Sequence, residues 1–141
     1  MVCVFPGRLH WSELFTAKFE NGKWTNWRYA GDKLNKEYEL GEMHITADGN
    51  ELCFHSARSG DRGKYGIWIT KKVNGEWQQP ENLAVVNAPE NEGWPFITQD
   101  GNKLWFTRTY MGSPAIYRSE KVNGNWSEPE LILSQFAGSP H

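Results

Sequence analysis

KVNGEWQQPE at residues 72–81 and KVNGNWSEPE at residues 121–130 agree at seven of ten positions, 49 residues apart. An earlier copy, FENGKW at residues 19–24, keeps the Asn-Gly-x-Trp pattern. A second pair of blocks, ITADGNELCF at residues 45–54 and ITQDGNKLWF at residues 97–106, recurs at an offset of 52. Because the two kinds of block alternate in the same order, the chain is built from a repeat of about 50 residues.

Each block is predicted to be a β-hairpin. Asn-Gly and Asp-Gly pairs supply the positive φ angles that two-residue type I′ turns require. Apolar residues flank the turns, with Ile67-Trp68-Ile69 before Asn74-Gly75 and Leu104-Trp105-Phe106 after Asp100-Gly101. One period therefore holds four short strands joined as a meander.

A four-stranded unit that repeats roughly every 40–50 residues is typical of a β-propeller blade. The predicted fold is all-β: a partial β-propeller of three antiparallel meander blades, at about residues 1–33, 40–84 and 92–134. Residues 2–24 align without a gap on residues 104–126, so the first blade lacks its first strand. Eleven strands are expected, in groups of three, four and four. The 8 Trp, 7 Phe, 5 Tyr and 14 Gly agree with an all-β chain.

The strand–Asp-Gly–strand unit, the pairs Ile67-Trp68 and Ile116-Tyr117, and the Asn-Gly-x-Trp-x-x-Pro pattern resemble the TolB-type, WD40-like propeller repeat. NAPENEGWP at residues 87–95 looks like the linker before the first strand of such repeats. The resemblance covers nearly the whole chain, but TAD at 46–48 and TQD at 98–100 replace the usual Ser-Pro-Asp. It implies a bacterial protein, often of the cell envelope or periplasm, that is a binding module or part of an enzyme.

The small number of blades has a consequence for partners. Intact propellers hold roughly 4–8 blades. We therefore expect this chain to be completed by blades of a longer parent chain or by self-association. Three blades per copy favour a homodimer that closes a six-bladed ring.

Charge and hydropathy exclude several classes of partner. The 15 Lys and Arg residues against 17 Asp and Glu residues leave no basic footprint for nucleic acid. Apolar runs of at most five residues are too short for a membrane span, and the N-terminal residues lack the pattern of a signal peptide. The compartment stays open.

No catalytic, metal or cofactor motif is present. The four histidines are scattered, without the spacing of metal ligands. Neither a nucleophile elbow nor a phosphate-binding or dinucleotide fingerprint occurs. We predict no cofactor, no metal and no catalytic residue, and whether the chain is an enzyme stays open. Cys3 and Cys53 both align with Trp105, which favours buried free thiols over a disulfide.

The candidate binding face follows from the meander. The tight turns of each blade are expected at one end of the blades. The loops between the second and third strands, at residues 6–13, 57–66 and 109–115, are expected at the other end, together with the linker at residues 87–93. Rigid scaffolds place binding groups on such loops. The candidate ligand-binding residues are Arg8, His10, Trp11, Arg58, Asp61, Arg62, Glu92, Trp94, Arg108 and Tyr110, with Tyr65 beside them. Arginine, aromatic and acidic groups suit an anionic or carbohydrate ligand, although an ordinary solvated loop face would have the same composition.

Function is less determined than fold. The sequence favours a non-catalytic binding or interaction module with an unknown protein or carbohydrate ligand. The alternative is a carbohydrate-binding or glycan-active, glycosidase-like or sialidase-like fragment, whose carboxylate pair would come from Glu42, Asp61 or Glu92. A structural remnant without a ligand is a third possibility. The repeated Trp24, Trp77 and Trp126 indicate packing between blades, and Asp48 and Asp100 are interpreted as turn residues.

Overall fold

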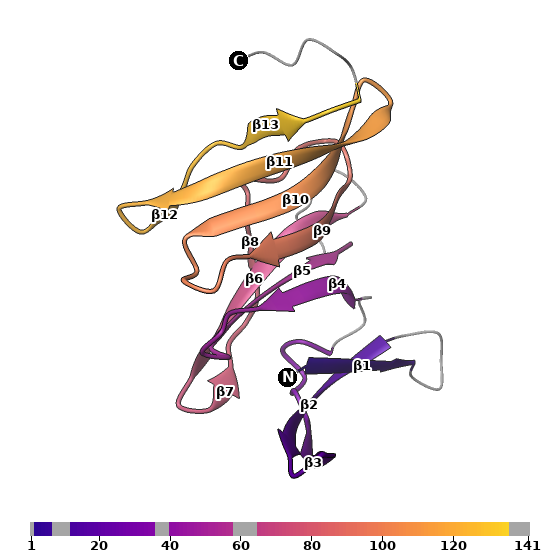
Figure 1. Ribbon diagram of the computed structural model, residues 1–141, viewed down its shortest axis with the longest axis vertical. Helices are drawn as coiled ribbons and strands as arrows, with labels where there is room; N and C mark the ends of the chain where they lie inside the picture. Colours follow the sequence, from indigo (N-terminus) through magenta and orange to yellow (C-terminus); the bar gives the residue numbers. More distant parts are fainter. Residues whose placement is uncertain (1, 7–11, 36–39, 58–64, 136–141) are drawn as a thin grey trace.

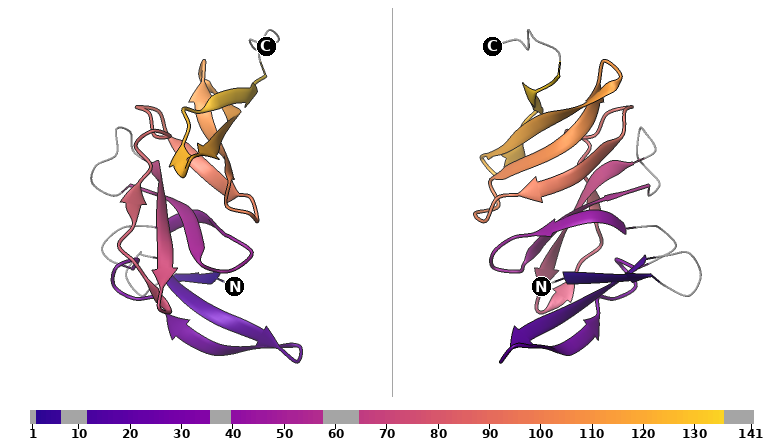
Figure 2. Two further views of the ribbon diagram at one scale, coloured as in Figure 1. Left: turned by 90° about the vertical axis from the view of Figure 1, so that its left-hand side faces the viewer. Right: turned by 45° about the vertical axis from the view of Figure 1, so that its right-hand side comes forward.

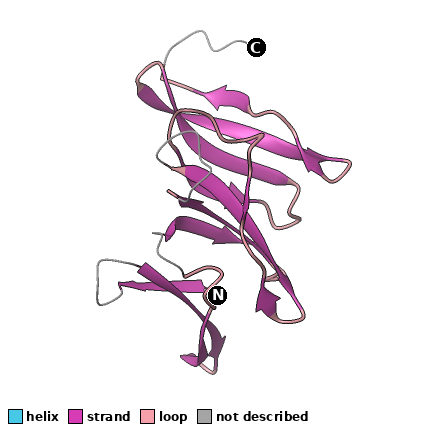
Figure 3. Cartoon of the chain, turned by 180° about the vertical axis from the view of Figure 1, so that it is seen from behind, coloured by secondary structure: helices cyan, strands magenta, loops and turns pink. Residues whose placement is uncertain are grey.

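The computed structural model describes residues 2–6, 12–35, 40–57 and 65–135, which form strands, turns and loops with no helix among them (Figure 3). The strands form three antiparallel sheets stacked along the long axis of the molecule (Figure 1). We call them blade 1, blade 2 and blade 3. Blade 1 comprises β1 (Val2–Pro6), β2 (Ser12–Glu20) and β3 (Lys23–Tyr29). Blade 2 comprises β4 (Leu40–Ile45), β5 (Glu51–Ser56), β6 (Gly66–Val73), β7 (Glu76–Trp77) and β8 (Glu81–Asn82). Blade 3 comprises β9 (Glu92–Ile97), β10 (Lys103–Tyr110), β11 (Ser113–Val122), β12 (Asn125–Trp126) and β13 (Glu130–Leu133).

The described residues form thirteen strands where the sequence predicted eleven, because the fourth strand of blades 2 and 3 is split in two. In blade 2, β7 and β8 both pair with β6, and Pro80 lies between them. Proline has no N–H to donate to the ladder. At the break, the Thr70 hydroxyl donates to the carbonyl of Gln78 over 2.7 Å, which links β6 to the segment between β7 and β8. Pro129 occupies the same place in blade 3.

The Asn-Gly turns have the predicted geometry. Both residues of Asn74-Gly75 have positive φ angles, of 50° and 81°, and the pairs at 21–22 and 123–124 repeat them. The Asp-Gly turns do not, because only the glycine has a positive φ there. Asp48 instead accepts hydrogen bonds from the Thr46 hydroxyl (2.6 Å) and the Asn50 amide (3.0 Å), which closes a longer loop between β4 and β5. Asp48 is thus confirmed as a turn residue.

The blades pack face to face through two apolar clusters (Figure 2). Because successive side chains of a strand point to opposite faces, Leu52 and Phe54 face blade 1 while Cys53 faces blade 3. Trp77 is 6% exposed and packs with Leu14 of β2 and with Leu34, which follows β3. This confirms the packing role predicted for Trp77. Cys53 is a buried free thiol, as predicted.

A repeated asparagine fixes the connection between blades. The side chain of Asn87 accepts from the Ile67 amide (2.7 Å) and donates to the Ile67 carbonyl (3.0 Å), as a neighbouring strand would. Asn35 makes the same pair of bonds with Leu14, one blade earlier. Asn87 thus attaches the linker after blade 2 to β6, and Asn35 attaches the linker after blade 1 to β2. The next blade therefore begins at a fixed position in both cases. As a result β4 and β9, the first strands of blades 2 and 3, lie side by side (Figure 1).

Candidate functional site

A pocket of about 290 Å³ opens between blades 2 and 3, at the end opposite the Asn-Gly turns. It is lined from the blade 2 side by Glu42 of β4, His55 of β5 and Tyr65 just before β6. From the blade 3 side it is lined by Glu92 and Trp94 of β9 and Arg108 of β10. Two carboxylates, a guanidinium, an imidazole and two aromatic rings therefore line one pocket. This mixture is typical of ligand sites.

Hydrogen bonds from two backbone amides hold the two sides of this pocket together. The Glu92 amide donates to the carbonyl of Tyr65 over 3.1 Å, and the Tyr65 amide donates to the side chain of Asn91 over 3.2 Å. The start of β9 is thus tied to the segment that leads into β6. Because such bonds fix the backbone on both sides, the pocket exists before any ligand binds.

The floor of the pocket is a buried ion pair. Nε of Arg108 lies 2.8 Å from Oε1 of Glu92, and the Glu92 side chain is fully buried. The same oxygen accepts a hydrogen bond from the Ala88 amide over 3.0 Å. The Arg108 guanidinium also donates to the carbonyl of Val86 and lies 4.8 Å from the ring centroid of Tyr117. Arg108 is therefore held by charge, hydrogen bonds and an aromatic ring at once.

The second oxygen of Glu92 has no such support. Oε2 is buried and has no hydrogen-bond partner among the residues that the structure describes. Burial raises the pKa of Glu92 to about 7, although the Ala88 amide and Arg108 lower it. A buried acceptor left unpaired costs free energy, roughly 1–3 kcal/mol. Glu92 therefore offers either an acceptor or, when protonated, a donor to a group that enters the pocket.

The ion pair between Glu92 and Arg108 in blade 3 has no counterpart at the equivalent positions of blade 2. Glu92 and Arg108 are paired in register on β9 and β10. The residues 52 positions earlier, Leu40 and Ser56, are paired in the same way on β4 and β5. Leu40 is buried and apolar. Since the same place in the fold is filled there without charge, packing alone does not require an ion pair at this position.

On the other wall, Glu42 and His55 form an ion pair through Oε2 and Nδ1 when His55 is protonated. The imidazole also lies 5.3 Å from the ring centroid of Tyr65. Gly41 makes this arrangement possible, because a Cβ at that position would overlap the His55 ring. The glycine is thus required for close approach and not for a turn.

Trp94 is the most exposed aromatic group of the pocket, with 65% of the residue accessible. It lies in a bulge of β9, where the register with β10 shifts. Its φ of 44° is in the left-handed region, which is rare for a bulky residue. Strained positions of this kind are concentrated at functional sites. Glu42 occupies the equivalent bulge of β4, so both bulges contribute a side chain to the pocket.

The structure brings three of the ten sequence-predicted residues together, namely Glu92, Trp94 and Arg108. Tyr110 instead packs against the apolar cluster between blades 2 and 3. The remaining six lie outside the described residues: Arg8, His10, Trp11, Arg58, Asp61 and Arg62.

Two local predictions about this face were wrong. The segment at residues 109–115 was expected to be a variable loop, but β10 and β11 run through it and join at Met111-Gly112. The φ angles of 49° and 81° at that pair give a two-residue turn. Glu92, Gly93 and Trp94 were expected in a linker loop, but they belong to β9. Arg108 and Glu92 are therefore held by a sheet and not by solvated loops.

His55 was missed by the sequence analysis because no motif marks it. Its position depends on Gly41 and on a contact with Tyr65, which is ten residues away. The repeat did contain a signal for the ion pair. Aligning the two blades at an offset of 52 places Glu92 on Leu40 and Arg108 on Ser56, so that two opposite charges replace an uncharged pair.

Comparison with known proteins is informative for the fold. No family model matches the sequence, and no curated protein sequence matches it significantly. The structure is similar to that of TolB from Acinetobacter baumannii, with a TM-score of 0.56 and 15% sequence identity. The match covers 89% of this chain and 29% of that chain. The fold is a partial β-propeller. At this level of identity the likeness extends to the fold alone.

Within this partial propeller, the described residues contain no helix long and apolar enough to cross a membrane. Among the same residues, no three His, Cys, Asp or Glu side chains lie close enough to hold a metal ion.

Proposed function

We propose that this partial propeller is a ligand-binding module whose site is the pocket between blades 2 and 3. The observation that carries the proposal is the buried Oε2 of Glu92, which lines the pocket and has no hydrogen-bond partner in the described part of the chain. A buried polar atom without a partner is uncommon in folded proteins. A ligand that donates a hydrogen bond to it recovers the free energy lost on burial.

The rest of the pocket favours a carbohydrate as that ligand. Sugar hydroxyls both donate and accept, so one hydroxyl can donate to Glu92 while a neighbour accepts from Arg108. Trp94 offers an exposed aromatic face to the apolar side of a sugar ring. His55 and Glu42 add further polar groups on the opposite wall. A pocket of about 290 Å³ suits one sugar residue of a longer chain.

The test is calorimetric titration of the protein with a panel of neutral and acidic oligosaccharides. Glu92→Gln and Trp94→Ala should each weaken binding about tenfold or more. Trp24→Ala is the control, because Trp24 lies on blade 1 and does not line the pocket. If no saccharide binds, or if all three variants bind as the wild type does, the proposal is wrong.

A second candidate is glycan hydrolysis, which one observation favours. Glu92, with its raised pKa of about 7, shares a pocket with the carboxylate of Glu42. Glycosidases use one protonated and one ionised carboxyl group. Turnover of chromogenic glycosides that is lost in both Glu92→Gln and Glu42→Gln would support hydrolysis. Binding without turnover would leave the module non-catalytic.

Completion of the ring belongs to the same proposal. Exposed aromatic residues on blade 1, namely Phe19, Trp24, Trp27 and Tyr29, support a contact with further blades, either of a second copy or of a longer parent chain. The two-copy arrangement would give six blades. A bacterial cell-envelope location is consistent with such a binding role, and fractionation of the cells that produce the protein would test it.

A further inference from the structure

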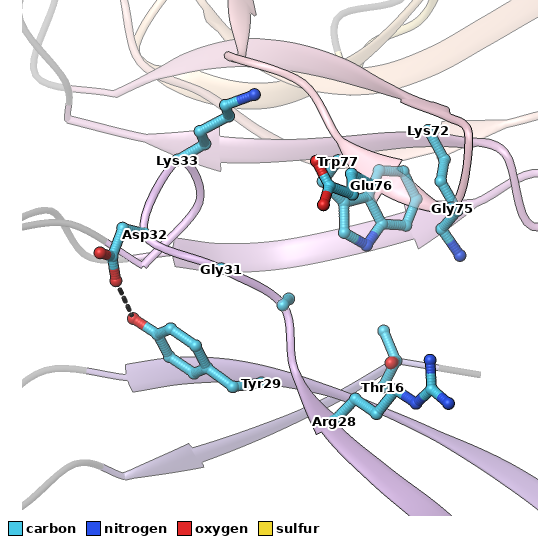
Figure 4. Close-up of a pocket in the computed structure, with 11 residues that line it drawn as sticks. Thr16, Arg28, Tyr29, Gly31, Asp32, Lys33, Lys72, Gly75, Glu76 and Trp77 are labelled. Carbon is cyan, nitrogen blue, oxygen red and sulfur yellow. Dashed lines mark hydrogen bonds between the residues drawn. The ribbon is translucent and has the colours of Figure 1, made fainter.

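A second pocket lies at the opposite end of the molecule, between blades 1 and 2, with a volume of about 420 Å³ (Figure 4). Thr16, Arg28 and Tyr29 line it from blade 1, and Asp32 and Lys33 from the turn that follows. From blade 2 it is lined by Lys72, Gly75, Glu76 and Trp77, around the Asn-Gly turn. It shares no lining residue with the pocket between blades 2 and 3.

This pocket contains an unsatisfied buried donor. Trp77 is 6% exposed, and no described residue forms a hydrogen bond with its Nε1. The indole N–H can only donate, so an acceptor is missing there. In Figure 4 the indole nitrogen and the ammonium group of Lys72 both point toward Thr16 and Arg28. The missing acceptor would therefore lie between cationic side chains.

The charges around Trp77 favour an anion. Of the three cationic side chains that line the pocket, Arg28 and Lys72 lie on the side toward which the indole nitrogen points, whereas Lys33 points away from Trp77 (Figure 4). The lining also includes two carboxylates. One of these, Asp32, already accepts a hydrogen bond from the Tyr29 hydroxyl over 3.1 Å. The other, Glu76, belongs to an exposed residue of the hairpin.

The repeat provides a direct comparison in blade 3. There Lys121 lies 4.8 Å from the ring centroid of Trp126, as Lys72 lies 4.7 Å from that of Trp77. Lys121, however, is paired with the carboxylate of Glu51 across the blade interface, at 3.3 Å. Among the described residues, no carboxylate forms such a pair with Lys72. The lysine of the blade 3 site thus has a carboxylate partner, whereas Lys72 has none among the described residues.

We infer that the pocket between blades 1 and 2 binds a small oxyanion, such as a carboxylate or phosphate group, at the place that Glu51 fills one blade later. The anion accepts a hydrogen bond from Nε1 of Trp77 and pairs with Lys72 and Arg28. Hydrogen bonds from charged donors to oxyanions are among the strongest available in proteins. No sequence motif indicates this site, because it depends on two blades coming together.

The probes are inorganic phosphate, sulfate and acetate, each titrated into the protein at constant ionic strength with chloride as the balancing ion. The readout is the Nε1–H resonance of Trp77 in a ¹H–¹⁵N spectrum, assigned by its loss in Trp77→Phe. The expected result is a saturable shift of this resonance. Lys72→Gln should weaken the binding about tenfold, because it removes a charged donor. Differences among the three probes identify whether a phosphate, sulfate or carboxylate group fits best.

Lys121→Gln is the matched control, because Lys121 already has Glu51 as its partner and lies in the other interface. It should leave the titration unchanged. If Lys72→Gln does not fold, Arg28→Gln replaces it, since Arg28 is an exposed residue. A shift that does not saturate, or one that is equal in the wild type and in the Lys72 and Arg28 variants, would overturn the inference. Neither outcome bears on the saccharide titration of the other pocket.

Discussion

Glu92 and Arg108 face each other across β9 and β10, 2.8 Å apart, in the register positions that Leu40 and Ser56 occupy in blade 2. One fold thus accepts two pairs of residues at the same place, one uncharged and one ionic. Breaking a buried ion pair leaves one charge without its partner, whereas replacing both residues does not. A double-mutant cycle at Glu92 and Arg108 can therefore measure the coupling between the two side chains.

Glu92→Leu alone should destabilise the protein by about 3 kcal/mol, because it leaves the Arg108 guanidinium largely buried without its carboxylate. Arg108→Ser should have a similar effect for the converse reason. The double variant reproduces the pair of blade 2 and should recover most of the loss. Urea unfolding of the wild type and the three variants measures the coupling. Additive losses would show that the two side chains do not interact energetically.

The pH dependence of stability should report on Glu92. Its pKa of about 7 in the folded protein exceeds the ordinary value of 4.5. Between these two values the folded state binds more protons than the unfolded state, so stability falls as the pH rises through this window. Thermal unfolding at a series of pH values should show a lower Tm at the upper end. Glu92→Gln should flatten the curve, and Glu128→Gln, at an exposed position, should not. Equal slopes in the wild type and Glu92→Gln would contradict this assignment.

The repeated tryptophans should differ in their effect on stability. Trp77→Ala should cost about 3–5 kcal/mol, because it empties a buried position between blades 1 and 2. Trp24 occupies the equivalent position of blade 1 but is 37% exposed, and Trp24→Ala should cost far less. Chemical denaturation of the two variants compares them. Similar losses would mean that Trp24 is also buried, by a contact between chains.

The fold could be predicted from the sequence because it depends on local signals repeated at fixed spacing. Asn74-Gly75 requires positive φ angles, and its copies at 21–22 and 123–124 identify the same hairpin in every blade. The three-stranded sheet of blade 1 and the packing of Trp77 followed from the same alignment. The Asp-Gly turns were assigned wrongly because hydrogen bonds to Asp48 select a longer loop.

The candidate site could be predicted only in part because it depends on contacts between blades. Glu92, Trp94 and Arg108 were identified, although as loop residues. The sequence did not indicate that Met111-Gly112 forms a tight turn, which extends β10 past Arg108. Nor could it place His55, since the approach of an imidazole over Gly41 is a tertiary contact.

Substitution of Trp94 should weaken saccharide binding without lowering the stability of the fold. Its φ of 44° favours glycine, and most of its side chain is exposed. Trp94→Gly should therefore leave the stability unchanged or raise it by up to about 1 kcal/mol. The same variant should lose saccharide binding, because the aromatic face is gone. Tm and calorimetric titration on one preparation measure both effects. A large loss of stability would show that the indole packs against the fold and is not free to contact a ligand.

Self-association depends on the two outer faces of the stack. On blade 1, Phe19 is 59% exposed and its ring lies 4.8 Å from that of Trp24. On blade 3, Arg118 occupies the position of the buried Ile69 of blade 2, and it pairs with Glu130 over 2.9 Å. One outer face is thus aromatic and the other carries charges over an apolar sheet. Different faces suit a head-to-tail contact, which closes into a ring when two copies supply six blades.

We therefore predict a homodimer that buries about 1,200–2,000 Å² or more in total. Light scattering after size exclusion should give twice the 16.2 kDa of one chain. Phe19→Glu places a charge in the aromatic face and should yield monomers. Val73→Glu, at an equally exposed apolar position of blade 2, is the control and should remain dimeric. A 16.2 kDa species with cooperative unfolding that does not depend on protein concentration would rule out the dimer, because dissociation is linked to concentration by mass action. In that case the exposed face of blade 1 would have to contact a different partner, and the blades of a longer parent chain would be the next to test.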